Sequence, residues 1–247
     1  MVGLSSLALW QLLLSLFKPD GFVLPAPFDI ISKLITNWSK VGAGLYNTGF
    51  IVVTGLIAGV ILGVLAALTV TASRTASEMI TPLAVAVNAI PIIALAPIFK
   101  AWFGLLSPVS NQLVVTVLVF FPIFVNTARG LTQVDPAQLE LMDSFAASRW
   151  KVMTGVRIPN ALPFFFTAVK LSTSLAVIGA IVAEYFGGRQ DALGPIITQN
   201  AGLTRYAEAW AAVLAGTALG GVLYLLAVGL ERYFVPWDTS ADRRLQR

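Results

Sequence analysis

Apolar runs of about twenty residues recur along this chain of 247 residues, and they restrict it to folds that sit in a lipid bilayer. A helix of about 20 residues crosses roughly 30 Å of hydrocarbon. Hydrophobic residues make up 57% of the chain and charged residues 11%, and the mean hydropathy is +0.83, which is not the composition of a soluble domain. We therefore predict an all-α, polytopic membrane protein that forms a single domain over residues 1–247.

The apolar runs predict six membrane-spanning helices, at about residues 2–17, 45–70, 79–103, 113–127, 164–186 and 209–234. The first run lacks a basic start and a convincing cleavage site, so we interpret it as a retained span. Residues 28–38 have the spacing of an amphipathic helix on the membrane surface. Residues 187–202, which are rich in glycine and polar side chains, predict a polar loop between the last two spans.

Glycines and prolines inside the spans predict close packing and kinks. Gly55, Gly59 and Gly63 recur every four residues, and helices without Cβ atoms there approach closely and gain van der Waals contact. We favour helix packing over a transport role for these glycines. Pro91 and Pro122 each remove a helical hydrogen bond, which is tolerated where protein or a water-filled cavity offers partners.

Basic residues near the span ends predict the orientation, because cytoplasmic loops carry more Lys and Arg. The side that contains both termini receives Arg74, Arg129, Arg149, Lys151, Arg157, Arg232, Arg243, Arg244 and Arg247. The other side receives Lys18, Lys33, Lys40, Lys100, Arg189 and Arg205. The first set is larger, so we expect both termini in the cytoplasm.

The longest polar interval, residues 135–163, predicts a hairpin of two short helices on the cytoplasmic side, at about residues 135–160. Asp135 can cap the first helix and Ser148 the second, because their side-chain oxygens can accept from free backbone N–H groups. Pro159 disfavours helical backbone at Ile158 and is expected to end the second helix. A charged, amphipathic hairpin between two spans must meet water or a partner on its exposed side.

Composition excludes several kinds of site. The chain has no Cys and no His, which removes disulfides, thiol nucleophiles, imidazole bases and their metal sites. No GxxxxGK[ST] phosphate loop is present, so ATP is not bound through that motif. The net charge of +4 fits basic residues that flank spans, and we expect no nucleic-acid partner. No catalytic constellation supports an intramembrane enzyme.

Two ionisable residues are predicted inside the fifth span. Lys170 stands near its cytoplasmic end and is expected to snorkel. Glu184 lies near its outer end, and a carboxylate at bilayer depth should face the protein interior or an aqueous cavity. It could line a substrate path, fix a gate by hydrogen bonding, or lie at the interface. Two such groups are few for an ion-coupled carrier, so any energy for pumping more plausibly enters through the hairpin.

The hairpin resembles the cytoplasmic loop of binding-protein-dependent ABC importer permeases. The pattern Glu140-Leu-Met, then Ala146, then Val156-Arg-Ile-Pro159 has the spacing of that loop's E-A-A, Gly and I-x-L-P consensus. Segments Ile90–Pro97, Trp102–Gly104, Phe121–Asn126 and Val182–Glu184 also resemble the nitrate/sulfonate/taurine-type branch. This chain departs from the consensus at three positions. Leu141 and Met142 stand where the consensus has alanines, and Ala146 stands where it has a glycine, so the docking bend differs in detail.

The resemblance implies the type I ABC importer permease fold with a cytoplasmic coupling helix, in the bacterial plasma (inner) membrane. It also implies a second permease copy in a homodimer, two cytoplasmic ATP-binding subunits and an extracytoplasmic substrate-binding protein, besides membrane lipid. ATP and Mg²⁺ would sit on the ATPase, with no cofactor on this chain. The residues implied in coupling are Glu140, Leu141, Met142, Phe145, Ala146, Ala147, Ser148, Arg149, Trp150 and Pro159.

The path through the bilayer is expected among polar groups near the prolines and glycines. The candidates for the path or its gate are Asn47, Thr48, Asn88, Pro91, Asn126 and Glu184. The family branch implies a small sulfonate, taurine or nitrate as substrate, although relatives also resemble carriers of pyrimidine vitamin precursors or flavins. The alternative to an importer permease is a stand-alone secondary transporter or channel.

Overall fold

The structure, a computed structural model, describes residue 10, residues 25–72 and residues 92–237, and all regular elements among these residues are helical. Most of the predicted first span and the first half of the predicted third lie outside the described residues. In chain order the elements are α2 (Pro27–Thr36), α3 (Trp38–Ala72), η1 (Ile92–Leu95), α5 (Ala96–Phe103), α6 (Pro108–Thr132), α7 (Pro136–Ser144), α8 (Arg149–Val152), η2 (Met153–Arg157), α9 (Ile158–Tyr185), α10 (Leu193–Gly202) and α11 (Tyr206–Phe234).

Four helical stretches in the described part are long and apolar enough to cross a bilayer. They are α3, α6, the continuous stretch Arg149–Tyr185 and α11, which confirms the second, fourth, fifth and sixth predicted spans. Each is longer than predicted. Pro122 lies inside α6 without ending it. The shorter apolar stretch Ile92–Phe103 is the described end of the predicted third span.

The glycines of α3 form a packing seam against α6. A Cβ atom on Gly55, Gly59 or Gly63 would lie 2.7 Å from Val115 Cβ, 2.7 Å from Val119 Cβ and 2.8 Å from Ile123 Cγ2, respectively. The three glycines on α3 and the three residues they face on α6 both recur every four residues, about one helical turn. Because each glycine has a hydrogen atom in place of a side chain, the two helices can pack this closely. The prediction that these glycines serve helix packing is confirmed.

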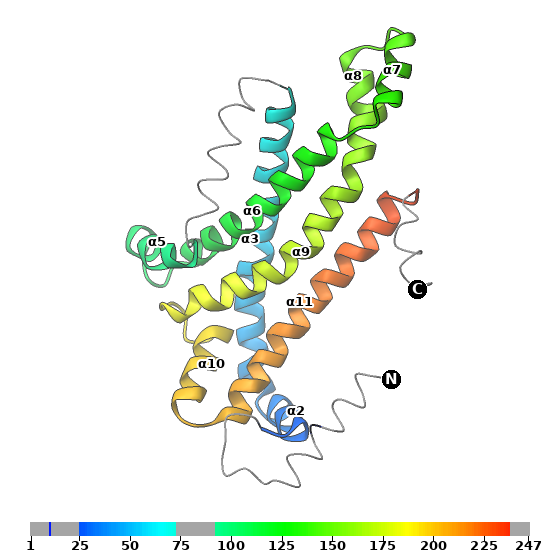
Figure 1. Ribbon diagram of the computed structural model, residues 1–247. Helices are drawn as coiled ribbons and strands as arrows, with labels where there is room; N and C mark the ends of the chain where they lie inside the picture. Colours follow the sequence, from blue (N-terminus) through cyan, green and yellow to red (C-terminus); the bar gives the residue numbers. More distant parts are fainter. Residues whose placement is uncertain (1–9, 11–24, 73–91, 238–247) are drawn as a thin grey trace.

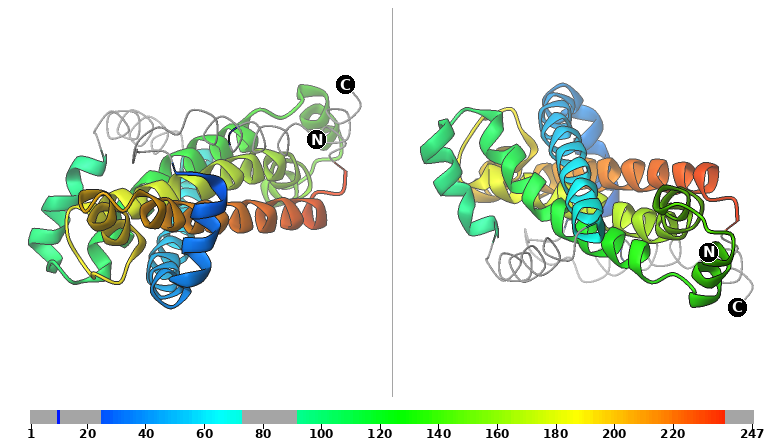
Figure 2. Two further views of the ribbon diagram at one scale, coloured as in Figure 1. Left: turned by 90° about the horizontal axis from the view of Figure 1, so that it is seen from below. Right: turned by 90° about the horizontal axis from the view of Figure 1, so that it is seen from above.

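The bundle has two distinct ends. Figures 1 and 2 show α6, α9 and α11 running beside one another while α3 crosses them. The helices α7 and α8 project at one end, which we call the hairpin end, and α2 and α10 gather at the opposite end, the α10 end (Figure 1). The helix α9 runs from one end to the other.

Two predictions about chain breaks were wrong. Residues 193–202 form the helix α10 within the predicted polar loop, because Leu193, Ile196 and Asn200 recur on one face and are buried against the bundle. Pro159 does not end a helix, and Ile158 keeps helical dihedrals (φ −64°, ψ −51°). The π-helical turn η2 widens the backbone just before Pro159, and the proline takes an early position in α9, where a missing N–H costs little.

Candidate functional site: a hairpin at one end and a buried clamp at the other

The hairpin is built from two capped short helices. The Asp135 side chain accepts from the N–H of Ala137 at 2.9 Å, and the Ser148 side chain accepts from the N–H of Lys151 at 3.4 Å. Both predicted caps are confirmed. Pro136 takes the first position of α7, as expected from its fixed φ.

The bend between α7 and α8 is a Schellman motif with alanine at its left-handed position. The N–H of Ala147 donates to Met142 O at 3.0 Å and that of Ala146 to Asp143 O at 2.9 Å, which is the motif's bond pattern. Ala146 has φ +48°, where glycine is the usual residue. The position that the consensus gives to glycine is therefore a left-handed bend in this chain.

Three large apolar side chains of the hairpin are exposed. Leu141, Phe145 and Trp150 are 57%, 74% and 73% exposed. Leu139 and Met142 are half-buried, and the exposed Phe145 directly follows the end of α7 at Ser144. Of the remaining coupling candidates, Glu140, Ala146, Ser148 and Arg149 are exposed and Ala147 and Pro159 are half-buried. The tip thus presents an apolar surface at the far end of the bundle.

The base of the hairpin is bonded to the end of α6. Asn160 donates its amide to Gly130 O at 2.7 Å and to Gln133 O at 3.0 Å, and Arg157 donates to Leu131 O at 3.3 Å. The last carbonyls of a helix have no partner within it, so these side chains complete the C-terminus of α6. Sequence reasoning missed this role for Arg157 and Asn160, since their partners lie about 30 positions away.

The path candidates gather only in part. Thr48 on α3 and Glu184 on α9 meet at the α10 end, where the Thr48 hydroxyl donates to the Glu184 carboxylate at 2.9 Å. Asn47 donates to Asp191 O at 2.8 Å, which fastens the segment before α10. Asn126 bonds within its own helix, to Pro122 O at 2.8 Å. Asn88 and Pro91 lie outside the described residues.

Glu184 is 2% exposed, and its carboxylate holds the start of α10. Glu184 Oε2 accepts from the N–H of Gly194 at 2.8 Å, and Thr48 Oγ1 accepts from the N–H of Leu193 at 3.0 Å. These two N–H groups have no acceptor inside α10, and a carboxylate is favoured at a helix N-terminus. Of the three predicted roles for Glu184, hydrogen bonding in the protein interior fits this geometry.

Lys100 on α5 completes this cluster, which we call the α10 clamp (Thr48, Lys100 and Glu184). Lys100 is 5% exposed, and its ammonium donates to Gly187 O in the turn that follows α9. Glu184 also interacts electrostatically with Lys100. Sequence reasoning placed Lys100 at the α10 end but missed its burial, because a lysine near the end of a span has the same appearance when it faces solvent.

Ion pairs lie outside the clamp as well. Lys170 on α9 donates to both carboxylate oxygens of Glu231 on α11, at 2.8 and 2.7 Å. The sequence analysis did not include this partner, which lies 61 positions away along the chain. On the turn before α10, the Arg189 guanidinium bonds Asp191 at 2.7 Å and lowers the pKa of that carboxyl.

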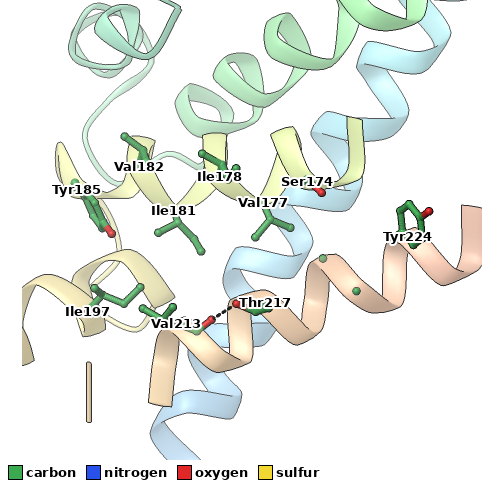
Figure 3. Close-up of a pocket in the computed structure, with 13 residues that line it drawn as sticks. Ser174, Val177, Ile178, Ile181, Val182, Tyr185, Ile197, Val213, Thr217 and Tyr224 are labelled. Carbon is green, nitrogen blue, oxygen red and sulfur yellow. Dashed lines mark hydrogen bonds between the residues drawn. The ribbon is translucent and has the colours of Figure 1, made fainter. Parts of the chain in front are cut away.

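A pocket of about 550 Å³ lies between α9 and α11 (Figure 3). None of its lining residues is charged, and the hydroxyl groups among them belong to Ser174, Tyr185, Thr217 and Tyr224. Tyr185 and Tyr224 lie at opposite ends of the pocket, while the Thr217 hydroxyl is bonded to Val213 O at 2.9 Å. Sequence reasoning missed this α9–α11 pocket, although Gly216, Gly220 and Gly221 on one helix signal a thin face.

Comparisons with known proteins agree with this arrangement. The chain is 32% identical over 239 residues to the riboflavin transport system permease protein of Chloroflexus aurantiacus, covering 95% of this chain and 87% of that one. It is 32% identical to the formylaminopyrimidine transport permease protein of Halalkalibacterium halodurans (87% and 86% covered) and 25% identical to the taurine transport system permease protein of Escherichia coli (94% and 86%).

Solved structures share the fold. An amino acid ABC transporter crystallised with histidines matches with a TM-score of 0.63 at 17% identity, covering 82% of this chain and 95% of that one. The inward-facing MetNI methionine ABC transporter matches with a TM-score of 0.57 at 19% identity, covering 81% and 96%. The sequence profile of the binding-protein-dependent transport system inner membrane components matches residues 59–237. With its spanning helices and the hairpin in place, the chain belongs to this family, the permease subunits of ABC importers.

Proposed function

We propose that the hairpin receives mechanical work from cytoplasmic ATPase subunits and that the chain itself hydrolyses nothing. The observation that carries this proposal is the exposed apolar tip (Leu141, Phe145 and Trp150) on a bend that is capped at both helices. A rigid apolar tip suits a hydrophobic groove on a partner. ATP and Mg²⁺ belong to that partner, and no cofactor belongs to this chain.

The base of the hairpin supports this role. Arg157 and Asn160 bond the start of α9 to the end of α6, so a push on the tip displaces two spanning helices together. A Cβ on Gly130 would lie 2.7 Å from Ala161 Cα, so the two helices also touch directly below these bonds. The hairpin can therefore act as a lever on the bundle instead of bending independently.

The assembly we propose contains two copies of this chain, two ATPase subunits and one substrate-binding protein. Apolar side chains of α3 and α11 remain exposed, among them Phe50, Ile57, Leu65, Leu225 and Leu230. A second copy and membrane lipid would cover them. The hairpin end is cytoplasmic in this proposal, with both chain termini, and the binding protein docks at the α10 end.

The coupling role can be tested with paired charge substitutions. Leu141→Asp with Phe145→Asp should leave membrane insertion intact and abolish copurification of the ATPase subunit, because two carboxylates would have to enter an apolar interface. Leu203→Asp, which changes a leucine 60% exposed at the opposite end, is the matched control and should retain the ATPase. Full retention by the double variant would remove the hairpin from the coupling mechanism.

For the substrate, we propose a flat heterocycle without a strong negative charge. The relatives named above carry riboflavin, a formylaminopyrimidine or taurine. The α9–α11 pocket offers two tyrosines and two small hydroxyls and no cation, which suits an uncharged ring better than a sulfonate. Uptake into proteoliposomes should be inhibited by an excess of the heterocycle and not by taurine. The reverse result would refute this assignment.

The hydrogen bonds of two buried or half-buried glutamates disfavour the alternative, a stand-alone carrier. The carboxylates of Glu184 and Glu231 are both engaged, by Thr48 with the Gly194 N–H and by Lys170, so neither is free to bind a coupling ion. Transport that depends on the ATPase subunit and on ATP would exclude this alternative directly.

A further inference from the structure

We propose that α10 is the moving element of the gate at the α10 end, and that Thr48, Lys100 and Glu184 are the positioning residues that hold it closed. This inference rests on the proposed transport function and adds to it the part of the chain that opens. The α10 clamp bonds α3 and α9 to the start of α10, and Lys100 on α5 bonds the turn between α9 and α10. None of these bonds lies within a single helix.

The shape of α10 suits a movable plug. It has 10 residues, which at about 1.5 Å each is far too short to cross a bilayer. On its N-terminal side Gly187 and Gly188 have φ +112° and +135°, and on its C-terminal side Thr204 has φ +58°. Glycine takes positive φ values readily, whereas Thr204 is in a conformation that is uncommon for a residue with a side chain. These positions flank α10, so a dihedral change at them would swing the helix.

Close packing at two glycines defines the closed position of α10. A Cβ on Gly194 would lie 2.5 Å from Glu184 Cβ, and a Cβ on Gly44 would lie 3.3 Å from Leu193 N. The start of α10 therefore touches both α9 and α3 at glycines. Contacts of this kind have two discrete arrangements, formed or broken, because a packed interface does not stretch continuously.

The charges of the clamp explain why it can open. Glu184 and Lys100 are both buried side chains of opposite charge type, and neither belongs to α10, so both stay in the bundle when α10 leaves. Lys100 would lose Gly187 O as its acceptor. Asn111, which is 4% exposed, lies beside the same turn, and its Oδ1 has no hydrogen-bond partner among the described residues. That oxygen is an unused acceptor near the turn that Lys100 now bonds.

Glu184 also places the gate in line with the hairpin. It stands at the end of α9, and the base of the hairpin stands at the start of the same helix. A displacement of α9 along or about its axis therefore changes the Glu184–Gly194 contact first. ATP-driven movement of the hairpin would therefore reach α10 through α9 alone, with no need for a relay of side-chain contacts across the bundle.

The test uses reversible cross-linking of the assembled transporter, which is simple because the chain has no native cysteine. Asn47→Cys with Asp191→Cys, positions now joined by a side-chain-to-backbone bond of 2.8 Å, are linked with a short reducible bis-thiosulfonate reagent. The matched control links Lys33→Cys with Glu208→Cys, an ion pair of 3.0 Å that joins α2 to α11 and includes no residue of α10.

We expect the first cross-link to lower substrate uptake at least tenfold and reduction to restore it, while the control pair retains uptake when linked. Uptake by the Asn47–Asp191 linked protein at the rate of its reduced form would overturn the gate assignment, as would failure of these two cysteines to react with one linker. Absence of uptake in the wild-type complex would instead refute the proposed function itself, so the two failures are distinguishable.

A second measurement does not depend on cysteine chemistry. Glu184→Gln preserves shape but weakens the hold on Gly194 and Thr48, and it should raise ATPase activity without binding protein about tenfold, as loss of a charge-assisted hydrogen bond shifts a two-state equilibrium by that order. Lys100→Met should do the same, and Lys100→Arg should restore coupling. Unchanged binding-protein dependence in both Glu184→Gln and Lys100→Met would show that the clamp only supports the fold.

Discussion

The left-handed alanine of the hairpin bend should make Ala146→Gly a stabilising substitution. An L-residue in this region costs roughly 1–2 kcal/mol because its Cβ crowds the following carbonyl. Glycine avoids this cost but gives up about 0.4–1 kcal/mol through the greater freedom of the unfolded chain. Since Ala146 has φ +48° and lies on the exposed surface, no packing is lost, and we expect a net gain of about 1 kcal/mol.

Amide hydrogen exchange can measure this gain where it occurs. The N–H groups of Ala146 and Ala147 close the bend, so their exchange reports its local opening. A gain of about 1 kcal/mol corresponds to roughly fivefold slower exchange. The matched control is Ala137→Gly in the first turn of α7, where the backbone is helical and the same substitution should speed exchange about two- to fivefold. Faster or unchanged exchange at the bend in Ala146→Gly would refute the reasoning about strain.

Two further predictions concern the bundle. Gly59→Ala should destabilise the protein by about 2 kcal/mol in thermal unfolding in detergent, because the new Cβ would lie 2.7 Å from Val119 Cβ and 2.8 Å from Thr116 O. Gly221→Ala is the control: this glycine has open space around it, so the substitution should be neutral or stabilising. Equal effects of the two substitutions would contradict the packing seam between α3 and α6. Lys170→Met should lower the free energy of unfolding by about 2 kcal/mol, because it leaves the Glu231 carboxylate without its partner. Adding Glu231→Gln should recover most of that stability. Additive losses in the double-mutant cycle would show that the ion pair contributes nothing to stability.

The sequence predicted the features that depend on neighbouring residues. The length of an apolar run determines whether a helix spans the bilayer, and four of the predicted spans appear as α3, α6, α9 and α11. The caps at Asp135 and Ser148 depend only on residues two or three positions ahead, and the α3 seam depends on a repeat of four within one helix. Each of these signals is contained in a short window.

The errors have the opposite character. The helix α10 was taken for a loop because its glycines and asparagine favour turns locally, whereas Leu193 and Ile196 gain burial only against other helices. Pro159 is predicted to end a helix by a rule that considers only the residue before proline. The structure instead has the π-helical turn η2 just before Pro159, which that rule does not include. The partner of Lys170 lies 61 positions away, beyond any spacing argument.

The two candidate sites differ in the same way: the hairpin depends on neighbouring residues, whereas the α10 clamp depends on residues far apart in the sequence. The hairpin could be predicted because it is a local structure, and such a structure can move as a rigid body without unfolding its surroundings. The α10 clamp could not be predicted, because Thr48, Lys100 and Glu184 come from three helices and their bonds form only when those helices are in register. A site assembled in this way senses relative displacement of α3, α5 and α9, since shifting any one of them by a single hydrogen-bond length breaks a contact. The end of the bundle that depends on long-range register is therefore the end best suited to respond when the hairpin moves α9.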